Sequence, residues 1–484
     1  MKTIANISHF WGRFASSALS ELVEVFGDKI HLPDVPPIRQ IRKGHSVREE
    51  YESRNRIFNQ WRTFWLFLSQ VFNQGEENHT CSKALKKAQA WLAIGESKTI
   101  SSNTSAYCQS RKRLNPLYLD KINREVVKPI EPQIPLKCLW YGRHVKVVDD
   151  SSVSMPDTER NQRLYPQPSG QKKGCGFPVM RIAVIFSLVT GMMLSYRSGN
   201  LHVHERTLWH EMWDCYQEND VVLADCGFCS FADYYLLKEK GVDCVMRLHQ
   251  RRKEKKVSKK FNGNDYLVRW EKGKCHHRPK WMSLEQWEQL PDTMLVRHLN
   301  VVVDTPGFRT KKLTLATTLL DPKAYPCNAL ADLYRRRWMA ELFLRDAKIT
   351  MGMRVLRSKT PEMIHKELSI FITAYNLIRS FIWELALKKG IDPYRISFKG
   401  AITSILEWTP FLATAKGVKE KKQILQCLMN AIATDLIPTR KNIRWEPRAI
   451  KRRPNPTYQL LTKNRHEFIE IPHKHNYKKC LTHG

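Results

Sequence analysis

Residues 144–241 constrain the fold most, because short apolar runs alternate there with helical patterns. Such alternation predicts a mixed α/β sheet, within a chain whose 484 residues are enough for roughly three domains. The turn expected at Thr190-Gly191 would join two paired strands. In chain order we predict a β-rich run from His144, two strands within 179–197, a helix at 202–216, a strand over Val221–Ala224, a helix near 231–240 and a strand over 243–248.

Carboxylates stand at the ends of two of these predicted strands. Asp149 and Asp150 lie in the β-rich run, and Asp225 directly follows the strand that ends at Ala224. Ligands bind at the carboxyl edge of such sheets. Because neighbours on a strand face opposite sides, only one of Asp149 and Asp150 can share a side with Asp225.

A third acidic side chain comes from residues 334–348, YRRRWMAELFLRDAK. The segment lacks Pro and Gly and is rich in helix formers, so we predict one helix. Tyr334, Arg337, Glu341 and Lys348 then share one face. One carboxylate among an aromatic ring and two cations suits a phosphodiester held beside a carboxylate-bound metal.

The other residues of this helix are expected to have other roles. Arg335, Arg336 and Arg345 lie off the shared face, as helix surface or general contacts to a DNA backbone. Trp338 and Phe343 are expected to face the core.

The charge favours a polyanionic partner. Lys plus Arg number 80 against 47 Asp plus Glu, a formal net charge of +33. A solubility device or an acidic protein partner is the alternative. Aromatic residues at 10% and hydrophobic residues at 42% exclude a basic disordered tail.

Cysteine usage and apolar runs bear on the compartment. The 12 Cys are scattered, as expected of reduced thiols in the cytoplasm. We expect no signal peptide, and the apolar stretch 182–194 is too short for a membrane span. The pair Cys226–Cys229 allows a redox or zinc interpretation that lacks a second matching pair. Residues 275–277, Cys-His-His, are more typical of a solvated loop.

Flanking segments suggest how DNA would be held. We predict three helices near the N-terminus, at 57–72, near 82–94 and at 105–114; the third is capped by Thr104 and carries Arg111 on its polar face. Such helices suit a DNA-end-binding module, or they are plain solvated helices. The basic run 247–260 is followed by Trp270, Trp281 and Trp287 and then by β-like runs at 294–303 and 313–320. Basic and aromatic residues in this order suit a binding path for a single nucleic-acid strand, and the alternative for each Trp is ordinary core packing. Residues 362–430 read as helical. After Pro438 a basic stretch would lie along DNA or another subunit, or pack on the core.

The spacing Tyr-x2-Arg-x3-Glu-x6-Lys resembles the signature of bacterial insertion-sequence transposases of the DDE type, in the insertion-sequence-four-like family with the Tyr-Arg-Glu-Lys (YREK) motif. The resemblance covers roughly residues 75–465 in order. The further segments that carry it are VVDDSSVSMPDT at 147–158, YPQPSGQKKGCGFPVMRIAVIFSLVTG at 165–191, VVLADCGFCSFADYYLL at 221–237 and KTPEMIHKELSIFITAYNLIR at 359–379.

The resemblance implies a ribonuclease-H-like core with a β-rich insertion, in which Asp149, Asp225 and Glu341 are catalytic and bind two Mg²⁺ or Mn²⁺ ions. Tyr334, Arg337 and Lys348 would bind DNA. Two departures stand out. Asp150 replaces a small residue, which makes Asp149 the expected ligand, and Cys226 replaces a common Arg. In such transposases an inserted Trp can hold a flipped base.

The expected activity is cut-and-paste transposition, with hairpin ends as one route. The partners would be double-stranded DNA, as terminal inverted repeats and target, and a second copy of the chain in a homodimer on DNA. The place would be the bacterial cytoplasm, at the nucleoid. The alternatives are a weakened or domesticated relative that only binds DNA ends, and a metal nuclease without strand transfer. The chain as a whole is expected to be a multidomain α/β protein. Its expected domains are an N-terminal arm (1–45), a helical DNA-end-binding domain (46–135), a ribonuclease-H-like catalytic core (136–248 and 321–380) interrupted by the β-rich insertion (249–320), and a helical, basic C-terminal region (381–484).

Overall fold

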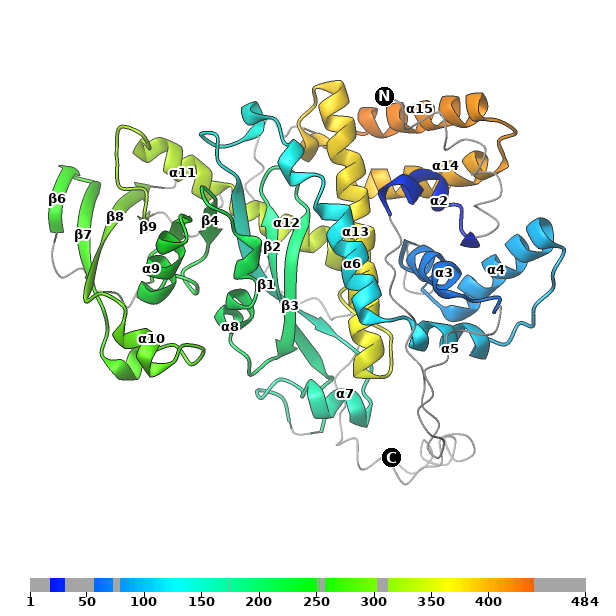
Figure 1. Cartoon of the computed structure of the whole chain (residues 1–484), viewed down its shortest axis with the longest axis horizontal. Coiled ribbons are helices and arrows are strands. Elements are labelled where there is room, and N and C mark those ends of the chain that lie inside the picture. The colour runs from blue at the N-terminus through cyan, green and yellow to red at the C-terminus, as the bar shows by residue number, and fades with distance from the viewer. Residues whose placement is uncertain are drawn as a thin grey trace.

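The computed structural model describes residues 18–30, 56–72, 79–172, 174–249, 252, 257–302 and 312–438. It shows a mixed α/β architecture, with a large sheet on one side and a group of helices on the other (Figure 1). The predicted basic stretch after Pro438, and most of the predicted N-terminal arm, lie outside the described residues.

Within the described residues, the sheet has nine strands in the order β3-β2-β1-β4-β5-β9-β8-β7-β6. Strands β1, β4 and β5 are parallel, and β2 and β3 pair antiparallel beside β1. The predicted turn is confirmed: residues 188–192 join β2 to β3, and Gly191 adopts φ +73°. The first five strands are β1 (Val145–Ser154), β2 (Val179–Ser187), β3 (Met193–Asn200), β4 (Val221–Ala224) and β5 (Asp243–Arg247).

The segment predicted as a β-rich insertion continues this same sheet. Its last strand pairs antiparallel with β5, and Val245 lies opposite Thr317. The insertion therefore extends the core edge to edge. Its elements are β6 (Val257–Asn262), β7 (Asp265–Glu271), α10 (Leu284–Glu288), β8 (Thr293–Val302) and β9 (Lys312–Thr317).

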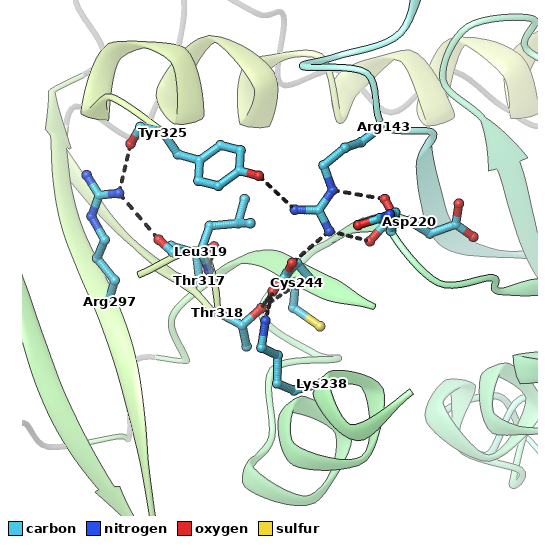
Figure 2. Close-up of polar contacts among 11 residues, drawn as sticks. Arg143, Asp220, Lys238, Cys244, Arg297, Thr317, Thr318, Leu319 and Tyr325 are labelled. Carbon is cyan, nitrogen blue, oxygen red and sulfur yellow. Dashed lines mark hydrogen bonds and ion pairs between the residues drawn. The ribbon is translucent and has the colours of Figure 1, made fainter. Parts of the chain in front are cut away.

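Two arginines hold the junction between insertion and core (Figure 2). Arg297 on β8 pairs with Asp265 and donates to the Tyr325 carbonyl at 2.8 Å. Arg143, just before β1, donates to the Tyr325 hydroxyl at 3.2 Å and to Asp243 Oδ2 at 2.7 Å. One tyrosine thus links the insertion, the core and the chain that leads into residues 327–335.

Apolar side chains bury both faces of the sheet. Val147 and Leu223 face a core that includes the long helix α13 (Pro361–Lys389), whereas Val148 and Ala224 face α8 (Glu205–His210) and α9 (Phe231–Glu239). By length and composition, α13 is the one helix among the described residues that could cross a membrane. Since 89% of its most apolar window is buried, α13 is the central core helix.

The helical part lies against α13 (Figure 1). Three expectations are wrong here. Residues 18–30, assigned to an arm, pack into the core through Val23 and Phe26. Arg111 is buried over the Phe67 ring, at 4.0 Å, and not on a polar face. The helix expected at 202–216 ends at His210. Other helices are α2 (Val23–Phe26), α3 (Gln60–Phe72), α4 (Cys81–Glu96), α5 (Ser105–Arg113), α6 (Pro116–Val127), α7 (Glu159–Leu164), α14 (Phe398–Thr414) and α15 (Val418–Thr434).

Candidate functional site

The segment 334–348 is not the single helix that its composition predicts. Helix α11 (Cys327–Arg335) ends just after Tyr334, α12 (Trp338–Arg345) begins anew, and a π-helical turn follows (Asp346–Thr350). Tight turns separate the helices: Arg337 N donates to Tyr334 O at 3.0 Å. Helix propensity is a weak constraint, and tertiary contacts override it here.

One guanidinium joins two of the predicted carboxylates. Arg337 Nη2 lies 3.0 Å from Glu341 Oε1, and Arg337 Nη1 lies 4.0 Å from Asp149 Oδ2. Burial raises the pKa of Asp149 to about 6, although the Arg337 charge and a hydrogen bond from Asp150 N lower it. The structure therefore brings β1 and α12 together at Arg337.

Asp225 reaches the same edge of the sheet from β4. Strand β4 pairs with the first residues of β1, and Asp149 and Asp225 each lie two residues beyond the paired Val147 and Leu223. Gly227 N donates to Asp225 Oδ1 at 2.7 Å, which fixes that carboxylate in the turn after β4. The charge of Asp225 acts on Tyr334, whose pKa burial raises to about 12, with a further increase from Asp225.

A second carboxylate group, not predicted from the sequence, adjoins Asp225. Arg181 on β2 lies 3.7 Å from Asp150 Oδ2 and 3.6 Å from Glu205 Oε2. A Cβ added to Gly227 would meet Glu205 Oε1 at 2.7 Å and Asp225 Oδ1 at 3.0 Å, so these two carboxylates are neighbours. The available signal was Glu205, an acidic residue at the start of a predicted helix.

Asp149 and Asp150 face opposite sides of β1, as predicted. Asp149 shares Arg337 with Glu341, while Asp150 shares Arg181 with Glu205. Burial raises the pKa of Asp150, and Asp225 raises it further against the lowering effect of Arg181. Asp225 thus adjoins Asp150 and Glu205, the group held by Arg181.

Lys348 reaches β1 from the π turn. Its ammonium donates to Ser151 Oγ at 2.6 Å, two residues beyond Asp149. Its charge also acts on Asp150. A cation therefore stands at the same end of the site as the β1 carboxylates.

The aromatic residues of the signature segment differ from prediction in one case. Phe343 is buried, as expected, but Trp338 is 43% exposed, because α12 starts afresh after the tight turns and presents a different face. Tyr334 is only 9% exposed. Arg335, Arg336 and Arg345 are exposed, as predicted.

Other metal-capable groups do not form sites. Cys229 is buried and Cys226 half-buried, while Cys275 and His276 are exposed. Among the described residues, no three His, Cys, Asp or Glu side chains converge in a way that would hold a metal ion, and this includes Asp149, Asp225 and Glu341, which the sequence predicted as one metal site. The oxygen donors of Asp149 and Glu341 still suit a hard divalent cation by chemistry, since such ions prefer carboxylates.

The insertion tryptophans are mainly core. Trp270 and Trp287 are buried, and Trp270 donates to His298 at 2.9 Å. Trp281 is half-buried, and its ring stacks on His210 with centroids 3.8 Å apart. The core alternative therefore holds for Trp270 and Trp287.

Two comparisons with known proteins indicate the family. The family model described as "Transposase DDE domain" matches residues 140–377, a span that includes every residue of the site. The transposase InsG of insertion sequence element IS4 from Escherichia coli (strain K12) is 24% identical over 357 residues, 72% of this chain and 77% of that one. The chain belongs to the DDE transposases. The resemblance stated from the sequence is confirmed.

Transposases of this family cleave DNA and transfer strands, and they use divalent metal ions. DNA is accordingly a partner of this transposase, in agreement with its net charge of +33. A cryo-EM structure of a piggyBac transposase synaptic complex with hairpin DNA is also similar, at 11% identity, a TM-score of 0.39 and 81% coverage of both chains. At that score the likeness adds nothing to the assignment.

Proposed function

We propose that this transposase cleaves DNA at the ends of an insertion sequence and joins the freed 3′ ends to target DNA, with Asp149, Asp225 and Glu341 as the catalytic, metal-binding carboxylates. The observation that carries the proposal is the placement of Arg337 between Asp149 and Glu341. These carboxylates come from a central strand and a distant helix.

The order of the first five strands supports a ribonuclease-H-like core. Strands β3, β2 and β1 run as an antiparallel group, and β4 and β5 continue in parallel from β1. The first proposed carboxylate lies on the central strand β1, and the second directly after its parallel neighbour β4. The parallel register, in which each lies two residues beyond the paired Val147 and Leu223, supports a shared site.

The proposed cofactor is Mg²⁺ or Mn²⁺, two ions per site. Such ions would supply an activated nucleophile and stabilise the leaving 3′ oxygen. The carboxylates of Asp149, Asp225 and Glu341 would be their ligands, and water and phosphate oxygens would complete the shells. The neighbouring Asp150 and Glu205 are held by Arg181 on the other side of β1.

The cations of the signature would hold the DNA. Arg337 offers planar donors that suit a phosphate, and Lys348 offers a point charge at the end of β1. Tyr334, only 9% exposed, would contribute its hydroxyl at the rim of the site. Along the chain, the three residues lie between the end of α11 and the π turn.

The proposed partners are the terminal inverted repeats, target DNA and a second copy of the chain. Each chain offers one carboxylate triad, so coordinated cleavage of two ends needs two chains, and cleavage through hairpin ends is compatible with such a complex. The proposed reaction would take place in the bacterial cytoplasm, at the nucleoid. The helical region before residue 135, the insertion and the basic C-terminal stretch would hold the DNA beyond the cleavage site.

A strand-transfer assay on a plasmid target tests the proposal. Asp149→Asn, Asp225→Asn and Glu341→Gln should each abolish cleavage and joining while end binding persists, since binding depends on cationic side chains. Asp332→Asn is the matched control, because this exposed carboxylate lies on α11 and, within the described part of the chain, pairs only with Arg335. Full joining by Glu341→Gln would refute the site assignment. End binding without joining by the unaltered protein would favour a DNA-end-binding protein instead.

A further inference from the structure

The turn that carries Lys348 is π-helical. Within Asp346–Thr350 the hydrogen bonds span five residues, as in the 3.1 Å bond from Met351 N to Asp346 O. A π turn takes up one extra residue and changes the direction of the side chains that follow α12. The contact of Lys348 with Ser151 on β1 therefore depends on this local geometry.

The first residue of the turn forms a buried ion pair with α13. Arg379 Nη2 lies 2.5 Å from Asp346 Oδ2, and the two side chains are 5% and 12% exposed. Burying such a pair costs desolvation free energy that largely offsets the attraction, so the pair is a poor source of stability. What it can supply is a fixed position for the residue it holds.

Arg379 is itself held on three sides. Its Nε donates to the Tyr375 hydroxyl at 3.1 Å, and that hydroxyl donates to the Gly191 carbonyl at 2.7 Å. Its guanidinium lies over the rings of Phe398 and Phe343, at 4.7 Å and 5.1 Å. The Arg379 guanidinium, which pairs with Asp346, is therefore restrained by these contacts.

The other end of the turn is anchored to β1. Arg354 N donates to Lys348 O at 3.0 Å, and Ser154 N on β1 donates to Arg354 O at 3.0 Å. Leu356 N then donates to Ser154 O at 2.9 Å. With Asp346 held by α13 and Arg354 held by β1, the backbone on both sides of Lys348 is fixed.

We infer that Arg379 is a positioning residue for DNA cleavage: through its ion pair with Asp346 it holds the π turn that directs the Lys348 ammonium to the end of β1. This inference rests on the proposed role of Lys348 in holding DNA. Arg379 is buried and does not reach DNA itself. Its effect on cleavage passes through Lys348.

A double-mutant cycle tests the coupling. Arg379→Lys, Lys348→Ala and the double variant are compared in single-turnover cleavage of end DNA at saturating DNA and Mg²⁺. We expect each single change to lower the cleavage rate about tenfold. In the Lys348→Ala background, Arg379→Lys should lower the rate by less than about twofold more, because the effects of coupled residues are not additive. A purely structural role would give the same factor in both backgrounds.

Arg297→Lys is the matched control. Arg297 is likewise buried and paired with a carboxylate, Asp265, but it lies in the insertion and does not contact the π turn. Any effect of this change should multiply with that of Lys348→Ala. Melting temperature and end binding are measured for every variant.

If Arg379→Lys does not fold, Asp346→Leu combined with Arg379→Met replaces the ion pair with apolar side chains. Such replacements often preserve stability, so this protein should melt near the unaltered temperature and still cleave slowly. Cleavage at the original rate would overturn the inference, as would equal factors for Arg379→Lys in both backgrounds, while the proposed function would stand. Unaltered cleavage by Lys348→Ala would instead refute the role of Lys348 and remove the basis of the inference.

Discussion

Replacing Asp149 with Asn should make the metal-free protein more stable while abolishing its activity. Burial raises the pKa of Asp149 to about 6, and its side chain is 17% exposed. The unfolded value is about 3.9, so ionised Asp149 costs the folded state about 3 kcal/mol at neutral pH. Asparagine keeps the shape and removes this cost.

The pH dependence follows from the direction of the shift. Because the folded-state pKa lies above the unfolded one, the folded protein binds more protons between about pH 4 and pH 6, and stability falls as pH rises through this range. The gain from Asp149→Asn should therefore be full above about pH 6 and absent below about pH 4. The midpoint of denaturant unfolding at pH 7.5 and pH 4, without metal, measures both.

Asp332→Asn serves again as the control, because its exposed carboxylate should leave stability unchanged at both pH values. Adding Mg²⁺ should stabilise the unaltered protein but not Asp149→Asn, since a ligand stabilises only the state that binds it. A lower stability of Asp149→Asn at pH 7.5 would show that the carboxylate is held by favourable contacts. The reasoning that burial of the ionised Asp149 carboxylate destabilises the folded state would then be wrong.

Three further predictions concern DNA. Affinity for end DNA should fall steeply with rising salt, because the Lys and Arg side chains behind the net charge of +33 release condensed counterions from the DNA when they bind its phosphates. An affinity that does not change across a salt titration would contradict this. Cys226→Arg should raise transposition frequency, because Cys226 adjoins Asp225 and a cation there would meet phosphate; an unchanged or lower frequency would show compensation by other cations. Mixing Glu341→Ala chains with unaltered chains should lower double-end cleavage more than in proportion, whereas a proportional fall would argue against a paired complex.

Sequence reasoning found the strands and their carboxylates because both follow from local pattern. Short apolar runs predicted β1, β4 and β5, and the parallel register sets Asp149 and Asp225 each two residues beyond the paired Val147 and Leu223. The family spacing then indicated Glu341, and the structure brings Glu341 to Arg337 and Asp149.

What sequence reasoning missed depends on contacts between distant segments. The π turn after α12 is held by Arg379, and the pairing of Glu205 with Arg181 joins α8 to β2. The exposure of Trp338 follows from the tight turns at residues 336–337, which no propensity predicts. Residues 18–30 looked like an arm because their apolar positions have no long periodic run, yet they bury Phe26 against Phe381.

Metal-specificity exchange tests the central claim most directly. Asp149→Cys should be inactive with Mg²⁺, a hard ion that binds thiolate poorly, and should regain cleavage with Mn²⁺. Asp150→Cys, one residue away on the other side of β1, should cleave with Mg²⁺. The account predicts rescue by Mn²⁺ at Asp149 alone. Rescue at Asp150, with Mg²⁺ activity retained by Asp149→Cys, would show that the metal is bound on the Arg181 side of the strand and would contradict the proposed site.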